Sequence, residues 1–148
     1  MPPPVVIIID TSILLCYLNV PGKNTTGEKS ERWDRARATA RIHADQQDGK
    51  LLVLPLATII ETGNHIAQAR DFASAKGLAE IIRKAATASE PWAAFTDQSV
   101  LWHTEALLKL ADAWPALAAA KLSIGDATIK EVAEYYAQTG RAVEILTT

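Results

Sequence analysis

The stretch Val5-Val6-Ile7-Ile8-Ile9-Asp10-Thr11-Ser12 decides the fold. Its first five residues are apolar and β-branched, and an unbroken run of this kind is typical of a strand that is buried on both faces of a parallel sheet. The next three residues are of types that cap helices, and the apolar segment 13–18 follows them. The sequence therefore predicts a buried strand that is followed directly by a helix.

The rest of the chain continues this alternation of strands and helices. Further strands are predicted at 51–54 and 142–146, with a short additional strand at 93–95, and an exposed loop is predicted at 19–30. Helices are predicted from Ser30 to Asp48, Thr58 to Ala69, Asp71 to Ala88, Gln98 to Asp112 and Asp126 to Thr139, with a stop or kink at Trp114-Pro115. The alternation favours one α/β domain over residues 1–148, a three-layer α/β/α sandwich around a mainly parallel sheet.

Composition narrows the classes of protein. The longest apolar stretch, 51–60, contains Pro55 and is too short to span a bilayer, and the chain start has no basic segment typical of a signal peptide. The single cysteine, Cys16, lies in an apolar run, which predicts a buried thiol and a reducing, cytoplasmic setting. The net charge is −2, so any attraction to nucleic acid must come from a local patch or from bound cations.

Three carboxylates follow from this layout. Asp10 directly follows the first strand, Glu61 is expected in the first turn of the helix after the second strand, and Asp126 is expected to open the helix before the last strand. The carboxyl ends of parallel strands meet at one edge of a sheet, where ligands bind. At about 5 Å and an effective dielectric near 20, each pair of carboxylates would repel by roughly 3 kcal/mol, which a divalent cation would offset. An all-oxygen set favours Mg²⁺ or Mn²⁺, which can orient water for attack on a phosphodiester.

Each acid also has a purely structural alternative. Thr58 and Glu61 fit a capping box, Ser123 and Asp126 fit a similar pattern, and Asp10 could cap the helix after the first strand. Taken singly, each alternative is the better interpretation. The placement of all three at the same sheet edge favours the metal site.

The chain resembles the PIN domain, the fold of many small endoribonucleases, in four segments. They are VVIIIDTSILL at 5–15, LPLATIIETGNH at 54–65, SIGDATI at 123–129 and VEILTT at 143–148. Each segment is short and weakly specific, but their order, spacing and strand-end placement together are more specific. The resemblance implies a metal-dependent endoribonuclease that acts on RNA, and a cytoplasmic toxin that is neutralised by an antitoxin protein and forms a homodimer.

The resemblance also implies roles for particular residues. Asp10, Glu61 and Asp126 would be the catalytic and Mg²⁺- or Mn²⁺-binding residues. Ser12 and Thr147 match positions where the family has a hydroxyl or amide that assists the site. Asn64, one helical turn after Glu61, would face the same way and contact substrate.

The chain departs from the family at its end. The family often has a Thr-x-Asp-like element after the last strand, whereas this sequence ends at Thr147-Thr148, one residue short of that acid. Either the sequence is truncated there or the site has three core acids, with Asp97 and Glu144 as weak substitutes. The alternative function is therefore a PIN-like RNA-binding or assembly module with weak or absent catalysis.

Basic and aromatic residues leave two interpretations open. Six cations gather around the 19–30 loop and the helix after it, and they form either a phosphate-contacting rim or a solvated helix face: Lys23, Lys29, Arg32, Arg35, Arg37 and Arg41. The four tryptophans could stack on bases, but packing is the better prediction for most of them. His65 is close to Glu61 in sequence, although a helix-surface role is favoured.

Overall fold

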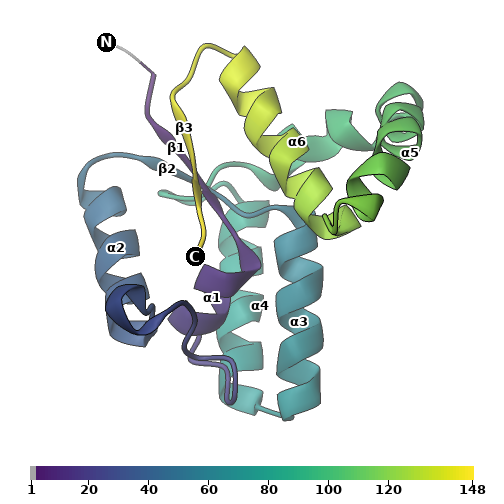
Figure 1. The fold of residues 1–148 in the computed structure, drawn as a ribbon. Helices are drawn as coiled ribbons and strands as arrows, with labels where there is room; N and C mark the ends of the chain where they lie inside the picture. The colour runs from purple at the N-terminus through teal and green to yellow at the C-terminus, as the bar shows by residue number, and fades with distance from the viewer. Residues whose placement is uncertain (1–2) are drawn as a thin grey trace.

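The computed structural model describes residues 3–148 and places the quoted stretch at its centre (Figure 1). β1 (Val6–Ile9) is buried along its whole length, as predicted, while Val5 lies outside it and is exposed. β2 (Leu51–Val53) and β3 (Val143–Leu146) flank β1, and both are parallel to it. The result is a mixed α/β fold with a small parallel sheet in the order β2-β1-β3.

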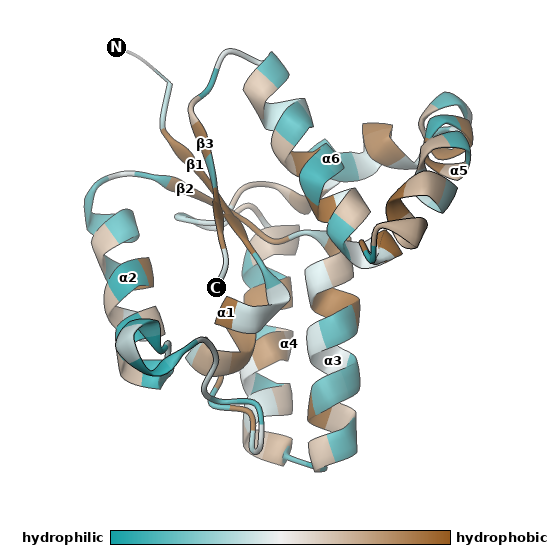
Figure 2. Ribbon diagram, in the orientation of Figure 1, coloured by the Kyte–Doolittle hydropathy of each residue, from teal (hydrophilic) through white to brown (hydrophobic). Residues whose placement is uncertain are grey.

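Apolar side chains cover β1 on both sides. Ile7 and Ile9 belong to one buried cluster, which includes residues of the helices α1 (Thr11–Tyr17), α2 (Arg35–Gln47), α3 (Leu56–Ala69) and α4 (Phe72–Ala86). Val6 and Ile8 belong to a second cluster, which includes residues of α6 (Ile124–Gln138). Alternate residues of a strand point to opposite faces, so each cluster takes alternate side chains. This explains why β1 is apolar at every position. In Figure 2 the strands at the centre of the fold are coloured mainly as hydrophobic.

The first half of the chain contains α1 (Thr11–Tyr17), a short 3₁₀ turn η1 (Lys29–Glu31) and α2 (Arg35–Gln47). The prediction that α2 begins at Ser30 is wrong. Trp33 pairs in an antiparallel bridge with Thr26, which keeps the chain extended there, and the side chain of Asp34 then caps α2 by accepting the backbone N–H of Arg37 at 2.9 Å.

Two neighbouring helices, which run antiparallel to each other, follow β2. α3 (Leu56–Ala69) begins two residues earlier than predicted, directly after Pro55. α4 (Phe72–Ala86) begins after the left-handed residue Arg70 and the N-cap Asp71, whose carboxylate accepts the N–H of Ser74. α3 packs against α1, α4 and α6, so it is the central helix of the site described below.

The segment between α4 and α6 differs most from prediction. No strand forms at 93–95 in the described chain; Trp92 makes a single parallel bridge to Leu52 of β2. The next carbonyl that could extend this pairing, that of Leu54, instead accepts the side-chain amide of Gln98 at 2.8 Å. The chain turns there into the 3₁₀ helix η2 (Phe95–Trp102).

α5 (Thr104–Ala119) and α6 (Ile124–Gln138) follow η2, and α6 leads into β3. The predicted helix 98–112 is divided at His103. Of the stop or kink predicted at Trp114-Pro115, the stop is wrong because α5 continues through Pro115. Proline removes one helical hydrogen bond, but Ala111, whose carbonyl is freed, is exposed, so water can donate to it. No helix among residues 3–148 is long and apolar enough to cross a membrane.

A network of ion pairs around the buried carboxylate of Asp45 ties α2 to the sheet. Asp45 is only 1% exposed and accepts from Arg41 at 2.9 Å and from Lys50 at 3.3 Å. Arg41 also binds Glu144 of β3 at 2.8 Å. Two cations therefore compensate the buried carboxylate, which would otherwise be costly to desolvate.

Candidate functional site

Asp10 lies between the carboxyl ends of β1 and β3. It is the N-cap residue of α1, but its side chain makes no capping hydrogen bond. Instead its Oδ2 accepts from the hydroxyl of Thr147 at 2.6 Å and from that of Ser12 at 3.1 Å. Its backbone N–H donates to the carbonyl of Leu146, which fixes the two strand ends side by side. The capping alternative for this carboxylate is therefore wrong, and both supporting residues predicted from the sequence contact it.

Glu61 is held between α1 and α6. It lies in the second turn of α3, so its predicted place in the first turn is wrong. Its Oε2 accepts from the hydroxyl of Thr11 at 3.2 Å, and its Oε1 packs against Gly125 so closely that a Cβ there would overlap it. Thr58 is inside α3 rather than at its N-cap, and its hydroxyl donates to the carbonyl of Ile9 at 2.8 Å. The capping-box alternative for Glu61 is therefore also wrong.

Asp126 lies in the first turn of α6 and is exposed. The helix starts two residues earlier than predicted, with Ser123 as N-cap, and the Ser123 hydroxyl accepts the backbone N–H of Asp126 at 3.0 Å. Half of the predicted capping pattern is thus present. Because this bond uses the backbone of Asp126, its carboxylate is left to interact with solvent or a ligand.

The three strand-end acids, Asp10, Glu61 and Asp126, act on one another electrostatically. The pKa of Glu61 is raised, first by burial and then by the negative charges of Asp126 and Asp10. The hydrogen bond from Thr11 opposes this increase, as does a smaller contribution from His65 on the next turn of α3. A partly buried carboxyl next to two other acids is the setting in which a cation is favourable.

These acids do not form a closed ligand set as they stand. Among residues 3–148, no group of three or more His, Cys, Asp or Glu side chains is close enough to hold a metal ion. Mg²⁺ usually keeps several of its waters and takes only one or two carboxylates directly. The oxygen chemistry of the three acids fits such a water-rich site, and metal binding stays a prediction.

The other predicted contributors make no side-chain hydrogen bond to the three acids in the described chain. Asn64 is exposed on α3, and no hydrogen bond to its side chain is found in the described chain. Of the substitutes for a fourth acid, Glu144 is paired with Arg41, and Asp97 lies near the phenol of Tyr136, whose pKa is raised mainly by burial and further by Asp97. Neither is among the charges that shift the pKa of Glu61.

Two residues of the site were missed at the sequence level. Thr11 resembles a helix-capping residue in sequence, and only its contact with Glu61, fifty positions away, shows its use. Gly125 carries no functional group, but it leaves the space that Oε1 of Glu61 occupies. In the sequence, the only indication of either residue was its position next to a predicted acid.

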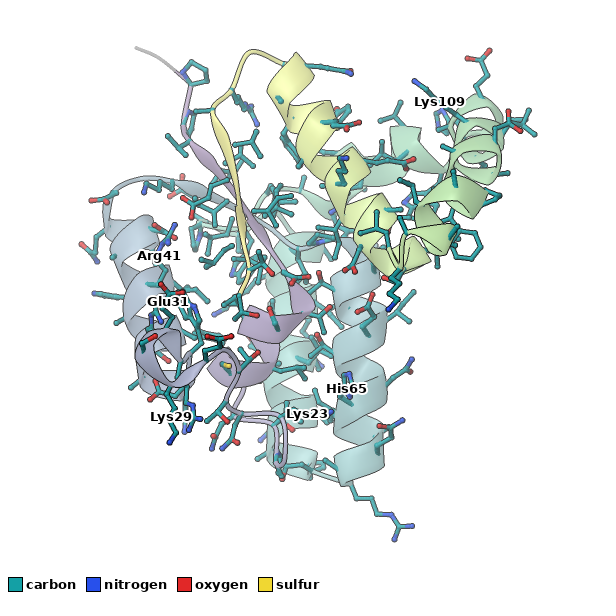
Figure 3. All side chains as sticks on the ribbon, in the orientation of Figure 1. Lys23, Lys29, Glu31, Arg41, His65 and Lys109 are labelled. Carbon is teal, nitrogen blue, oxygen red and sulfur yellow. The ribbon has the colours of Figure 1, made fainter. Side chains whose placement is uncertain are left out.

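The basic residues divide into two groups. Arg37 and Arg41 are structural, because the guanidinium of Arg37 donates to the carbonyls of residues 31 and 32 and lies 3.9 Å over the ring of Trp33, while Arg41 binds two carboxylates. The remaining four are exposed and make no ion pair within the described chain: Lys23, Lys29, Arg32 and Arg35. Figure 3 shows two of these lysines on the 19–34 loop.

The 19–34 loop reaches the same edge of the sheet as Asp10. The hydroxyls of Thr26 and Thr148 lie 3.4 Å apart, one residue beyond the contact between Thr147 and Asp10. This contact places Thr26 of the loop beside the strand-end edge, whereas none of the four exposed cations makes an ion pair with the strand-end acids in the described chain. The phosphate-rim interpretation of these four cations stays a prediction.

The aromatic residues are mainly structural. Trp33 and Trp92 are buried in the larger core cluster, as the packing interpretation predicts. Trp102 and Trp114 are half-buried, and the indole N–H of Trp114 donates to the carbonyl of Leu122. Cys16 is buried as predicted, and burial raises its pKa.

Comparison of the chain with protein-family models, curated proteins and solved structures found no match. The functional inference therefore rests on the site itself and on the short motifs of the sequence.

Proposed function

We propose that the chain is a Mg²⁺- or Mn²⁺-dependent endoribonuclease of PIN type, with the layered α/β/α architecture of that fold. The observation that carries the proposal is the pair of hydrogen bonds that the Asp10 carboxylate accepts. Its carboxylate is oriented by two hydroxyls from different elements, Ser12 and Thr147, although it occupies an N-cap position where it would normally bind backbone N–H groups. Outer-shell hydrogen bonds of this kind orient metal ligands.

The chain's residues divide the chemical work. Asp10 and Asp126 would hold the cation from opposite elements, and Glu61, oriented by Thr11, would complete the site and polarise the attacking water. When bound at these acids, Mg²⁺ or Mn²⁺ would supply the Lewis acidity that activates water and stabilises a leaving oxygen at phosphorus. The exposed cations of the 19–34 loop would contact flanking phosphates and position the RNA without reading its sequence.

Biological context is proposed from the resemblance alone. It comprises a cytoplasmic toxin that cleaves RNA, an antitoxin protein that neutralises it, and a homodimeric state. Each of these depends on the nuclease assignment being correct.

The test is metal-dependent cleavage of an RNA pool by the wild type and by Asp10→Asn. The wild type is expected to cleave only with Mg²⁺ or Mn²⁺, and Asp10→Asn is expected to lose cleavage while its melting temperature stays nearly unchanged, because asparagine still accepts both hydroxyl hydrogen bonds. Asp112→Asn, which removes an exposed acid from α5, is the matched control and should cleave normally. Equal cleavage by Asp10→Asn would refute the assignment.

The second candidate is a PIN-like RNA-binding or assembly module without effective catalysis. It is favoured by the lack of a closed three-ligand group among residues 3–148. The same experiment separates the two functions, because a module would retain RNA without cutting it at any metal concentration.

A further inference from the structure

An apolar pocket of about 290 Å³ adjoins the strand-end acids and is not used in the reaction described above. It lies where α3, η2, α5 and α6 come together, and its walls include Ile60, Trp102, Leu110 and Ile124. Glu61 is its one carboxylate residue. The pocket is thus a concave apolar surface with a single acidic residue in its wall, a common form of ligand site.

Two aliphatic side chains at the rim of this pocket are unusually exposed to solvent. Ile60 is 53% exposed and Ile124 is 51% exposed, although both are large aliphatic residues. They come from different helices, α3 and α6, which pack against each other near the starts of both (Figure 1). Covering apolar area is favourable, so this rim would gain free energy from an apolar occupant.

The pocket and the strand-end acids share two residues. Glu61 and Gly125 line the pocket, and the carboxylate of Glu61 packs against Gly125 within the acid site. An RNA strand whose phosphodiester lies at Asp10 and Asp126 can therefore place an adjacent nucleotide at the pocket. The walls offer no cation for a phosphate, whereas Trp102 and the isoleucines suit a flat apolar group.

We propose that this pocket binds the nucleobase of the nucleotide next to the scissile phosphate. The inference rests on the proposed function and specifies how its substrate is held. Single-stranded RNA can present unstacked bases to aromatic and apolar side chains, whereas paired bases are kept in the helix. Binding by stacking discriminates weakly among bases, so the enzyme selects an unpaired nucleotide rather than a particular sequence.

Fluorescence of a short oligoribonucleotide that carries 2-aminopurine tests the proposal without requiring cleavage. The titration uses the full chain with EDTA in place of metal, and stacking of the probe base reduces its fluorescence. Ile60→Ser and Ile124→Ser change exposed rim residues, so folding should be preserved, which melting temperatures will check. Ile82→Ser, at a position 37% exposed on α4 and outside the pocket, is the matched control.

The wild type and Ile82→Ser are expected to quench the probe, and each rim variant is expected to weaken its binding by about ten-fold. An otherwise identical oligonucleotide with an abasic nucleotide at the probe position should bind the wild type and the rim variants equally weakly. Unchanged quenching in both rim variants would overturn the proposal, as would equal affinity of the wild type for the abasic and base-bearing strands.

The two proposals fail in different ways. Metal-dependent cleavage by the wild type, combined with unchanged rim variants, refutes the base pocket and leaves the nuclease assignment intact. Rim-dependent quenching without cleavage at any Mn²⁺ concentration supports the base pocket and refutes the nuclease assignment.

Discussion

Gly125→Ala should separate stability from activity, because the added methyl group would occupy the place of a Glu61 oxygen. Gly125 has no left-handed backbone conformation, so alanine fits the backbone of α6 and should stabilise it by about 0.4–1 kcal/mol. The Cβ would overlap Oε1 of Glu61, so the carboxylate must rotate and lose the hydrogen bond from Thr11, which costs about 1 kcal/mol. The two effects nearly cancel in the free energy of unfolding.

The catalytic effect should be much larger. Misplacement of a reacting or ligating group by about 1 Å can reduce a rate about 100-fold, which we expect here for metal-dependent RNA cleavage. For a chain of this length, the melting temperature should change by less than about 4 °C.

Gly63→Ala provides the control for this prediction. It makes the same substitution inside α3, where a Cβ would meet only the side chain of Leu78, at an ordinary 3.8 Å. It should be as stable as the wild type or slightly more stable, and it should cleave at the wild-type rate. Thermal unfolding and initial cleavage rates measured on the three proteins decide the matter. If Gly125→Ala cleaves as fast as Gly63→Ala, the position of Glu61 does not matter for the reaction, and the reasoning fails.

Three further predictions follow from the contacts of other residues. Thr147→Val removes the hydroxyl that donates to Asp10 and should weaken Mn²⁺ affinity about 10- to 100-fold, whereas Thr147→Ser should retain the wild-type affinity. Mn²⁺ titrations compare the two variants, and equal affinities would exclude a positioning role for Thr147. The folded state raises the pKa of Glu61, so ionisation of this carboxyl at high pH lowers the free energy of unfolding. Glu61→Gln should therefore be more stable than the wild type at pH 8 without metal. This difference should vanish as the pH falls through the raised pKa of Glu61. A pH-independent difference in chemical denaturation would contradict this. Asp45→Asn removes the buried carboxylate that Arg41 and Lys50 share, while Arg41 keeps Glu144, so it should destabilise the fold by about 1.5–3 kcal/mol. The melting temperature should be lower by roughly 3–12 °C, whereas an unchanged value would show that the network contributes nothing.

The elements predicted best from sequence are those that local chemistry dictates. β1 could be recognised because a strand buried on both faces must be apolar at every position, and Asp10 could be placed at its end for the same reason. The starts of helices were harder to predict, since α2 begins at Arg35, after the N-cap Asp34, because Trp33 pairs with Thr26 across the loop. That pairing depends on the tertiary position of the loop, which no local pattern specifies.

The candidate site divides in the same way. Its acids were predictable because Asp10 and Glu61 come after strands and Asp126 opens the helix that leads into β3, which indicates a shared edge of the sheet. The partners of Glu61 were not predictable, because a threonine hydroxyl after a strand can equally bond to a backbone N–H or to a distant carboxylate. Thr11 makes the distant bond because Thr58 fixes α3 to the end of β1, which brings Glu61 within 3.2 Å of the Thr11 hydroxyl.

Binding of a divalent cation by the strand-end acids underlies the nuclease assignment, and calorimetric titration with Mn²⁺ tests it most directly. The wild type should give a saturable isotherm, and Asp10→Asn should give none at the same protein concentration, while both proteins melt at nearly the same temperature without metal. No Mn²⁺-dependent heat in the wild type, or the same isotherm in both proteins, would contradict the assignment of a cation site to Asp10, Glu61 and Asp126.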